Sequence, residues 1–241
     1  AAEKFANLPP NIQAACTAQN SWELGWERGA EQFNGKPDLY KGSFYARVPD
    51  EKGNLWPTDS VPEYRERYLA VAEMLKRVGE EVLRMVIPET KCLGRLRALG
   101  RALEYSFVED ETDKWCGEHR DFSVFTGLIG SIYLDAAGRE HPEPPEAGLH
   151  VRGRKVIIPP SCMAFQVGET SQLITNDAVT ATLHYVAAAR GLRRLTMALF
   201  LEPQDGNVVI ASQSKSFPER YKPNMTYGAW SSASYKRYKH N

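Results

Sequence analysis

The sequence from residue 115 to residue 128 reads WCGEHRDFSVFTGL, a β-type run that holds a histidine and an aspartate two positions apart. Side chains alternate across an extended strand with a period of two, so His119 and Asp121 point to the same side. A strand or its end can therefore offer one imidazole and one carboxylate to a single metal ion. A third ligand must come from elsewhere in the chain.

The second half of the chain continues this texture of short β-type runs. From about Arg101 onward, runs rich in β-branched and aromatic residues are separated by turn signals such as Asp205-Gly206-Asn207. Many short strands at this spacing favour a β-sandwich or barrel. The predicted strands are 122–134, 156–158, 163–167, 173–175, 179–186, 194–201 and 208–211.

An amphipathic helix is predicted ahead of the strands. Between residues 68 and 86, apolar residues recur at steps of three and four, with charged residues on the opposite face. Ser60 and Glu63 have the spacing of a capping box at its start, and Pro88 stops it. A second, shorter helical pattern covers residues 89–98.

The N-terminal residues 1–60 contain Asn, Pro, Gly and Trp in an irregular pattern, with aromatic residues such as Trp26 and Trp56 as possible anchors. We expect an ordered arm packed on a main unit of residues 61–241, in a single domain overall. A helix-rich first half packed on a β-unit predicts the α+β class.

Five histidines are present, and four of them compete for the place of the third ligand. His141 lies in an exposed polar loop, His240 is the penultimate residue, and His150 belongs to a short polar strand. His184 alone sits centrally in a strongly β-type run, residues 180–186. We therefore favour His184.

Ten positions after His184 comes Arg194-Leu195-Thr196, at the start of another apolar run. An arginine in a strand beside a metal site is suited to gripping a carboxylate through two parallel hydrogen bonds. Thr196, at the next position on the same side, adds a hydroxyl donor.

This pattern resembles the iron(II)/2-oxoglutarate oxygenases of the isopenicillin N synthase-like branch. The H-x-D, distal H and R-x-S/T of that family match His119/Asp121, His184 and Arg194/Thr196. The resemblance covers residues 95–202 well and the N-terminal arm more loosely. Supporting matches lie at 101–105, which reads like the R-x-L-x-Y strand of the family, at 126–128 and at 164–169.

The resemblance implies a double-stranded β-helix, or jelly roll, buttressed by helices, with iron at its open end. Three protein ligands leave positions on Fe(II) for 2-oxoglutarate and oxygen. Family chemistry oxidises an organic substrate while 2-oxoglutarate becomes succinate and CO2. Tyr105 would reach the cosubstrate carboxylate or would fill the roll. Arg120, where threonine is common, and Tyr185, where arginine is frequent, depart from the family pattern without touching a ligand position.

The resemblance also indicates where the substrate would bind. Residues 42–45 resemble a segment that borders the substrate pocket in this branch, and an aromatic anchor for the arm is the alternative. We expect an aromatic and aliphatic pocket with few polar groups, as is typical of small-molecule sites. Its predicted wall consists of Phe44, Tyr45, Phe122 and Phe125, and its substrate is a small molecule or a peptide-derived compound.

Two alternative functions remain open on the sequence. One is an oxidase of the same fold that applies the arginine to a carboxylate other than 2-oxoglutarate. The other is a binding or regulatory module with inactive iron chemistry, against which the intact residues His119, Asp121 and His184 argue.

Composition limits the kinds of partner and the cellular compartment that we expect for this chain. Thirty basic residues balance thirty acidic ones, so the chain lacks the global field that attracts nucleic acid or anionic membranes. No apolar run approaches a membrane span, and the mean hydropathy is −0.45. Four widely spaced cysteines favour reduced thiols in a cytoplasmic protein. Because the chain begins with Ala1 and not with Met, we expect that native N-terminal residues are missing from it.

Overall fold

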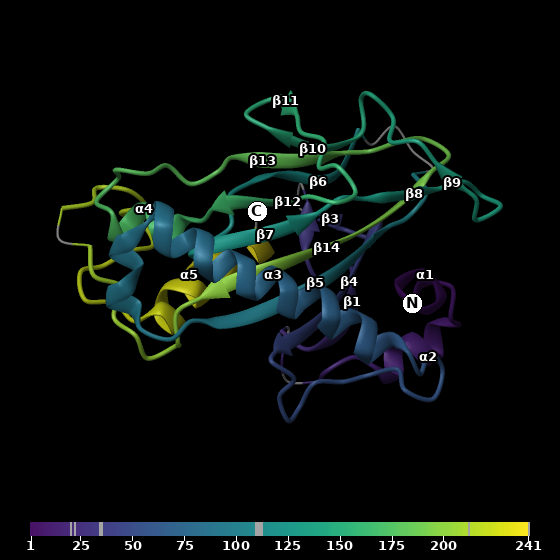
Figure 1. Cartoon of the computed structure of the whole chain (residues 1–241), viewed down its shortest axis with the longest axis horizontal. Helices are drawn as coiled ribbons and strands as arrows, with labels where there is room; N and C mark the ends of the chain where they lie inside the picture. Colours follow the sequence, from purple (N-terminus) through teal and green to yellow (C-terminus); the bar gives the residue numbers. More distant parts are fainter. Residues whose placement is uncertain (20, 22, 34–35, 109–112, 212, 241) are drawn as a thin grey trace.

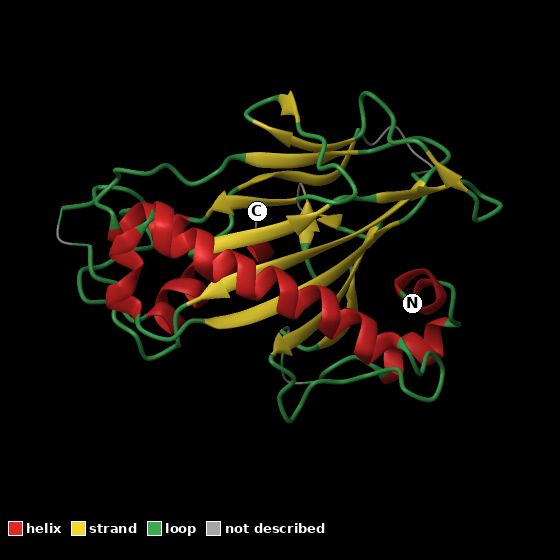
Figure 2. Ribbon diagram, viewed as in Figure 1, coloured by secondary structure: helices red, strands yellow, loops and turns green. Residues whose placement is uncertain are grey.

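The computed structural model describes residues 1–19, 21, 23–33, 36–108, 113–211 and 213–240. Two antiparallel sheets face each other, and helices cover the outer face of the larger one (Figures 1 and 2). The predicted α+β class is confirmed. Among the described residues, no helix is long and apolar enough to cross a membrane. The cysteines Cys16, Cys92, Cys116 and Cys162 are free thiols, as expected.

The larger sheet has the strand order β1-β4-β5-β14-β7-β12, and β8 and β9 extend it beside β14. The smaller sheet has the order β11-β10-β13-β6, and a short hairpin is formed by β2 and β3. The strands are β1 (Gly25–Arg28), β2 (Gln32–Phe33), β3 (Lys36–Pro37), β4 (Lys41–Val48), β5 (Arg97–Tyr105), β6 (Lys114–His119), β7 (Phe125–Ile129), β8 (Ile132–Leu134), β9 (Glu140–His141), β10 (Gly148–Val151), β11 (Arg154–Lys155), β12 (Met163–Val167), β13 (His184–Ala187) and β14 (Arg193–Glu202).

The long helix α3 (Tyr64–Val86) is the predicted amphipathic helix, and it crosses the larger sheet over β7 and β14 (Figure 1). Its buried residues follow each other at steps of three and four and include Tyr68, Ala72 and Leu75. The predicted capping box is wrong, because the helix begins one turn later and Glu63 is its N-cap without a side-chain cap hydrogen bond. The other helices are α1 (Ala2–Ala6), α2 (Pro10–Ala15), the 3-10 helix η1 (Pro88–Leu93), α4 (Glu169–Ile174) and α5 (Tyr227–His240).

Strand β14 shows why the core has two halves. Met197, Leu199 and Leu201 belong to the core between the larger sheet and the helices. Ala198, on the opposite side, belongs to a second cluster between the two sheets, together with Leu103 and Trp115. A strand buried on both faces separates its side chains into two layers with a period of two.

Several local predictions are wrong in a way that tertiary packing explains. Residues 1–60 are not irregular, because β1 and β4 enter the larger sheet and β4 pairs with β5 along its full length. The short helix expected over 89–98 stops at Leu93, since β5 takes residues 97 onward. The strand expected over 173–175 is the end of helix α4. The strands expected at 156–158 and 208–211 are absent from the described strands, with only a single bridge at Val208.

Candidate metal centre and its cavity

The three predicted metal ligands come together at one end of the smaller sheet. His119 ends β6, His184 begins β13, and the two residues are direct partners in the antiparallel register. Their ring centroids are 4.2 Å apart. Asp121 Oδ1 lies 3.6 Å from His119 Nε2 and 3.9 Å from His184 Nε2. One ligand atom from each of the three residues lies within 4.8 Å of the others, which is an arrangement that can hold a metal ion.

Backbone carbonyls orient both imidazoles. His119 Nδ1 lies 2.8 Å from the carbonyl oxygen of Gly117, and His184 Nδ1 lies 3.0 Å from that of Thr182. A carbonyl oxygen can only accept, so each Nδ1 carries a proton, and in the neutral form of each ring the lone pair is on Nε2. Both Nε2 atoms face Asp121, so the ring nitrogens available for a metal converge on one point.

The segment that carries Asp121 is tied to the first turn of α4. Glu169 N donates to Asp121 O at 2.7 Å, and Thr170 and Ser171 donate their hydroxyls to Phe122 O and Val124 O. Gly168 makes this close approach possible, since a Cβ there would lie 2.0 Å from Ser123 O. Helix α4 therefore fixes the backbone on which the carboxylate ligand stands.

The Asp121 side chain accepts two hydrogen bonds on one oxygen. Thr126 Oγ1 donates to Asp121 Oδ2 at 2.7 Å, and Gln166 Nε2 donates to the same oxygen at 2.6 Å. Although burial alone raises it, the pKa of Asp121 is lowered by His184, His119 and these two donors. The carboxylate is therefore held in the ionised form that a metal requires.

The two histidines have opposite pKa shifts. Burial, reinforced by the proximity of His119, lowers the pKa of His184 to about 4. Burial opposes the charged form of His119 too, but Cys116 and Asp121 raise its pKa to about 9. A metal that takes Nε2 of His119 would therefore displace a proton.

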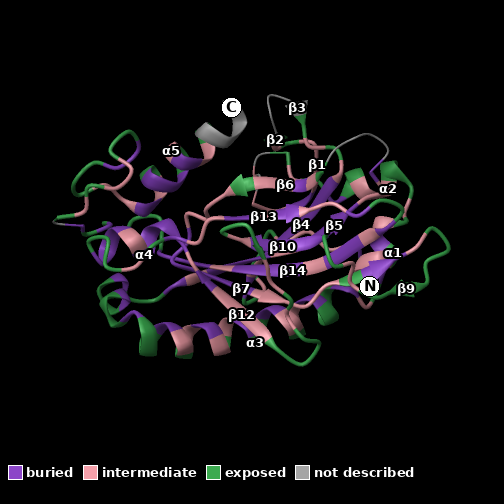
Figure 3. Ribbon diagram, turned by 90° about the horizontal axis from the view of Figure 1, so that it is seen from above, coloured by how far each residue is buried: buried purple, intermediate pink, exposed green. Residues whose placement is uncertain are grey.

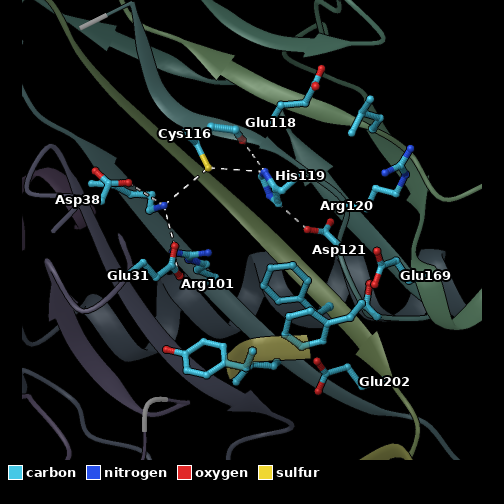
Figure 4. Close-up of a pocket in the computed structure, with 18 of the residues that line it drawn as sticks. Glu31, Asp38, Arg101, Cys116, Glu118, His119, Arg120, Asp121, Glu169 and Glu202 are labelled. Carbon is cyan, nitrogen blue, oxygen red and sulfur yellow. Dashed lines mark hydrogen bonds and ion pairs between the residues drawn. The ribbon is translucent and has the colours of Figure 1, made fainter. Parts of the chain in front are cut away.

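A cavity of about 520 Å³ opens beside His119 and Asp121 (Figure 4). One side of it, which we call the charged wall, consists of Glu31, Asp38, Lys41 and Arg101. Lys41 is buried and pairs with Glu31 at 2.7 Å and with Asp38 at 2.9 Å. Arg101 pairs with Glu31 at 2.7 Å and lies over the ring of Tyr45.

The charged wall corrects the expectation of a pocket with few polar groups. Further acids and bases line the cavity, among them Glu169 and Arg220, which form a bidentate pair at 2.6 and 3.0 Å. Aromatic residues line it as well: Tyr45, Phe122, Phe200, Phe217 and Tyr235. Tyr235 belongs to α5, the last helix of the described chain, which is partly buried (Figure 3). This helix therefore contributes to the cavity.

Two of the predicted pocket residues line the cavity and two do not. Tyr45 and Phe122 are lining residues. Phe44 is 1% exposed and packs against Phe5 and Tyr64, with ring centroids 5.2 and 4.8 Å apart. Neighbouring residues of a strand face opposite sides, so Phe44 points into the core whereas Tyr45 points into the cavity. Phe125 also lies in the core, where it stacks on Phe165 at 5.3 Å.

The predicted cosubstrate residues lie on the inner face of the larger sheet, outside the lining of this cavity. Arg194 pairs with Tyr105 on one side and Tyr133 on the other, and its guanidinium lies 5.1 Å from the ring centroid of Tyr105. Arg194 is 6% exposed, and its buried Nε has no hydrogen-bond partner in the described part of the chain. The Thr196 hydroxyl donates to Ile129 O at 3.2 Å.

Register places these residues relative to the charged wall. Arg194 is opposite Tyr105, whereas Ala198 is opposite Arg101. Four residues of strand separate the two arginines along the sheet, which is about 13 Å. Arg194 and Arg101 thus form two separate cationic positions on the same inner face.

Sequence reasoning missed the charged wall and the role of Gln166. Lys41 and Arg101 are charged residues on the inward side of β-type runs, a signal that alternation could have revealed. Gln166 is visible in the sequence only as part of a motif. Its contact with Asp121 depends on the pairing of β12 with β7, which no local pattern specifies.

Comparison with known proteins supports the fold. No protein-family model matches the sequence, and no curated protein matches it. Among solved structures, the neighbours are 2-oxoglutarate-Fe(II) oxygenases, so the fold is the double-stranded β-helix of that class and the predicted jelly roll is confirmed.

Three of these neighbours illustrate the likeness. A 2OG-Fe(II) oxygenase family protein from Caulobacter crescentus is 20% identical, with 98% of this chain and 83% of that chain covered and a TM-score of 0.72. JOX2, in complex with 2OG, Fe and JA, is 16% identical over 99% of this chain and 71% of its own, with a TM-score of 0.70. The dioxygenase for auxin oxidation from rice is 18% identical over 98% of this chain and 79% of its own, with a TM-score of 0.60.

Proposed function

We propose that this chain is an iron(II)- and 2-oxoglutarate-dependent dioxygenase that oxidises a small organic molecule and releases succinate and CO2. The observation that carries the proposal is the convergence of His119 Nε2, Asp121 Oδ1 and His184 Nε2 on one point in this fold. Two imidazoles and one carboxylate are the ligand set of non-haem iron oxygenases.

The donor set fits Fe(II). His184 presents an unprotonated Nε2, His119 would offer its Nε2 once a metal displaced the proton that its raised pKa retains, and Asp121 is held ionised. When bound, iron would supply the redox chemistry, while the protein holds the reactants in place and keeps water out. His119, Asp121 and His184 would fix the ion at the edge of the cavity, facing the aromatic side chains.

Arg194 fits the cosubstrate. A buried guanidinium with an unpartnered Nε, as the described residues leave it, is costly unless an anion completes its hydrogen bonds. A carboxylate of 2-oxoglutarate would meet that need, with Tyr105 beneath the guanidinium. Thr196 would add a donor only if its hydroxyl turned away from Ile129 O.

The cavity favours a polar substrate. Buried ion pairs contribute little net stability, so charges concentrated beside a metal centre point to recognition. The charged wall offers both signs of charge within one surface, and Tyr45 and Tyr235 add hydroxyls. Two neighbours, JOX2 and a protein from Neurospora crassa, are also in complexes with small molecules, JA and thymine.

The test begins with binding and then measures turnover. Anaerobic Fe(II) and 2-oxoglutarate binding should be followed by a substrate screen for succinate formation coupled to oxygen uptake. His119→Ala, Asp121→Ala and His184→Ala should each abolish iron-dependent turnover, while the exposed His141→Ala serves as the matched control. Oxygen uptake without succinate would favour the oxidase alternative. Absence of iron binding would favour a non-catalytic module.

A further inference from the structure

The two oxygens of Asp121 are treated differently by the protein. Oδ2 accepts from Thr126 Oγ1 and from Gln166 Nε2, at 2.7 and 2.6 Å. Oδ1 faces the two histidine Nε2 atoms instead, at 3.6 and 3.9 Å. The carboxylate therefore has one oxygen turned to the protein and one turned to the metal position.

The direction of each hydrogen bond follows from donor chemistry. An ionised carboxylate only accepts, so the single hydroxyl hydrogen of Thr126 goes to Asp121 Oδ2. Ser123 Oγ, 2.9 Å from Thr126 Oγ1, must then be the donor in that contact. The NH2 group of Gln166 faces Asp121, because its carbonyl oxygen would be repelled there.

Two donors fill the acceptor capacity of Oδ2. A carboxylate oxygen offers about two lone-pair sites. Hydrogen bonds to a charged group are short and strong, so breaking those of Oδ2 costs free energy. A metal ion that approaches Asp121 thus finds only Oδ1 available.

We propose that Thr126 and Gln166 are positioning residues that restrict Asp121 to binding the metal through Oδ1 alone. The proposal rests on the metal centre of the proposed function and adds to it the reason why coordination positions stay open. An octahedral ion with three protein ligand atoms keeps about three positions for other ligands. Asp121 bound through both oxygens would occupy one of them and would compete with chelation by 2-oxoglutarate.

Gln166 also touches a second ligand. Its Nε2 lies 3.2 Å from His184 Nε2, so the amide spans Asp121 and His184. A metal must replace that contact at His184, whereas the contact with Asp121 Oδ2 can persist. Substitution of Gln166 therefore affects two ligands, and substitution of Thr126 affects only Asp121.

The test uses Mn(II) as the probe and the whole chain as the protein. Thr126→Val removes the hydroxyl at nearly constant volume, Thr126→Ser retains it, and Gln166→Leu removes the amide. For each variant and for the Thr126→Val/Gln166→Leu double variant, water-proton relaxation counts the exchangeable waters on bound Mn(II). Titration with 2-oxoglutarate then gives the affinity of the Mn(II)-bound protein for 2-oxoglutarate.

The wild type and Thr126→Ser should keep about three exchangeable waters. The double variant should lose about one of them and bind 2-oxoglutarate roughly 10- to 100-fold more weakly, as is typical when support of a metal ligand is lost. Thr126→Val alone should move in the same direction, so the result survives if Gln166→Leu does not fold. Unchanged hydration and unchanged 2-oxoglutarate affinity in folded Thr126→Val and double variants would overturn the proposal.

A separate control distinguishes this proposal from the metal centre itself. His119→Ala should lose Mn(II) affinity by a large factor. If His119→Ala bound Mn(II) as the wild type does, the assigned metal centre would be wrong. His119→Ala could lose Mn(II) affinity while the Thr126 and Gln166 variants kept the hydration and 2-oxoglutarate affinity of the wild type. The metal centre would then be retained and the positioning role rejected.

Discussion

Arg194 is a cation that the fold keeps buried at the inner face of the larger sheet, between Tyr105 and Tyr133. Its Nε, unpartnered among the described residues, leaves its donor capacity unfilled. A buried charge is tolerated when an opposite charge completes it, and a ligand carboxylate is the completing group that we propose. At the residue scale, we therefore expect the proposed cosubstrate binding to depend most strongly on this guanidinium.

Arg194→Ala should weaken 2-oxoglutarate binding to the Mn(II) form by about 100-fold or more, which corresponds to about 2.7 kcal/mol. Thr196→Val should cost less, about one hydrogen bond, because its hydroxyl already has a backbone acceptor. Calorimetric titration measures both affinities, and the exposed Arg190→Ala is the matched control. An unchanged affinity in Arg194→Ala would remove the carboxylate role from this residue.

At the scale of elements, strand β4 shows how one strand serves the core and the cavity at once. Phe44 packs among aromatic side chains of the core, and Tyr45, the next residue, lines the cavity and donates to Glu31 at 3.2 Å. Helix α4 has a similar double role, because its first turn holds the segment that carries Asp121.

Phe44→Ala should lower the free energy of unfolding by roughly 3 to 5 kcal/mol, since it empties a buried aromatic site. Tyr45→Phe keeps the ring and removes only the hydroxyl, so it should cost about 1 kcal/mol. Urea denaturation followed by circular dichroism measures both. Equal losses of stability would contradict the assignment of the two residues to different faces.

Gly168→Ala should separate α4 from the segment 121–124, because its Cβ would meet Ser123 O at 2.0 Å. The expected result is a Mn(II) affinity lowered by about 10-fold or more, as Asp121 loses its fixed backbone position. Gly206→Ala is the control, since a Cβ there meets nothing within 4 Å. The assignment would fail if both alanine variants bound Mn(II) as tightly as the wild type.

At the scale of the whole molecule, Glu202 lies where the end of the larger sheet borders the cavity. It is buried at the end of β14, lines the cavity and accepts from Arg97 Nε at 3.0 Å. Burial raises the pKa of Glu202 to about 7, although Arg97 opposes the shift. A proton can therefore be held inside the folded molecule near neutral pH.

This proton makes stability depend on pH. Between the ordinary pKa of 4.5 and about 7, folded Glu202 keeps a proton that the unfolded chain has released. Rising pH therefore favours unfolding across this window, by an amount on the order of 3 kcal/mol. From about pH 5 to about pH 8, the free energy of unfolding of the wild type should fall relative to that of Glu202→Gln, because the opposite contribution of His184, whose pKa is lowered to about 4, is the same in both proteins. The exposed Glu140→Gln should keep the slope, and an unaltered slope in Glu202→Gln would exclude this source.

The sequence alone determined the elements whose local pattern is strong. Apolar residues spaced three and four positions apart located α3, and β-type runs located β12 and β14 almost to the residue. Periodicity is informative because it indicates which side chains are buried. The spacing in His119-Arg120-Asp121 also indicated two ligands on one side. The choice of His184 rested on a central place in a strand predicted over 179–186, but β13 covers only His184–Ala187 and His184 begins it. The residue nevertheless meets His119 and Asp121 as expected.

Only the tertiary structure decided which surfaces meet. The pairing of His119 with His184, the reach of Gln166 to Asp121, and the direction of Phe44 and Tyr45 all depend on strand register and on which face becomes the cavity. Leu173 and Ile174 belong to helix α4 and Thr175 is its C-cap, and the first turn of this helix donates to the Asp121 segment about 50 positions away in the chain. The two-residue period of a strand shows that neighbouring side chains face opposite sides. It does not show which side would hold a metal ion.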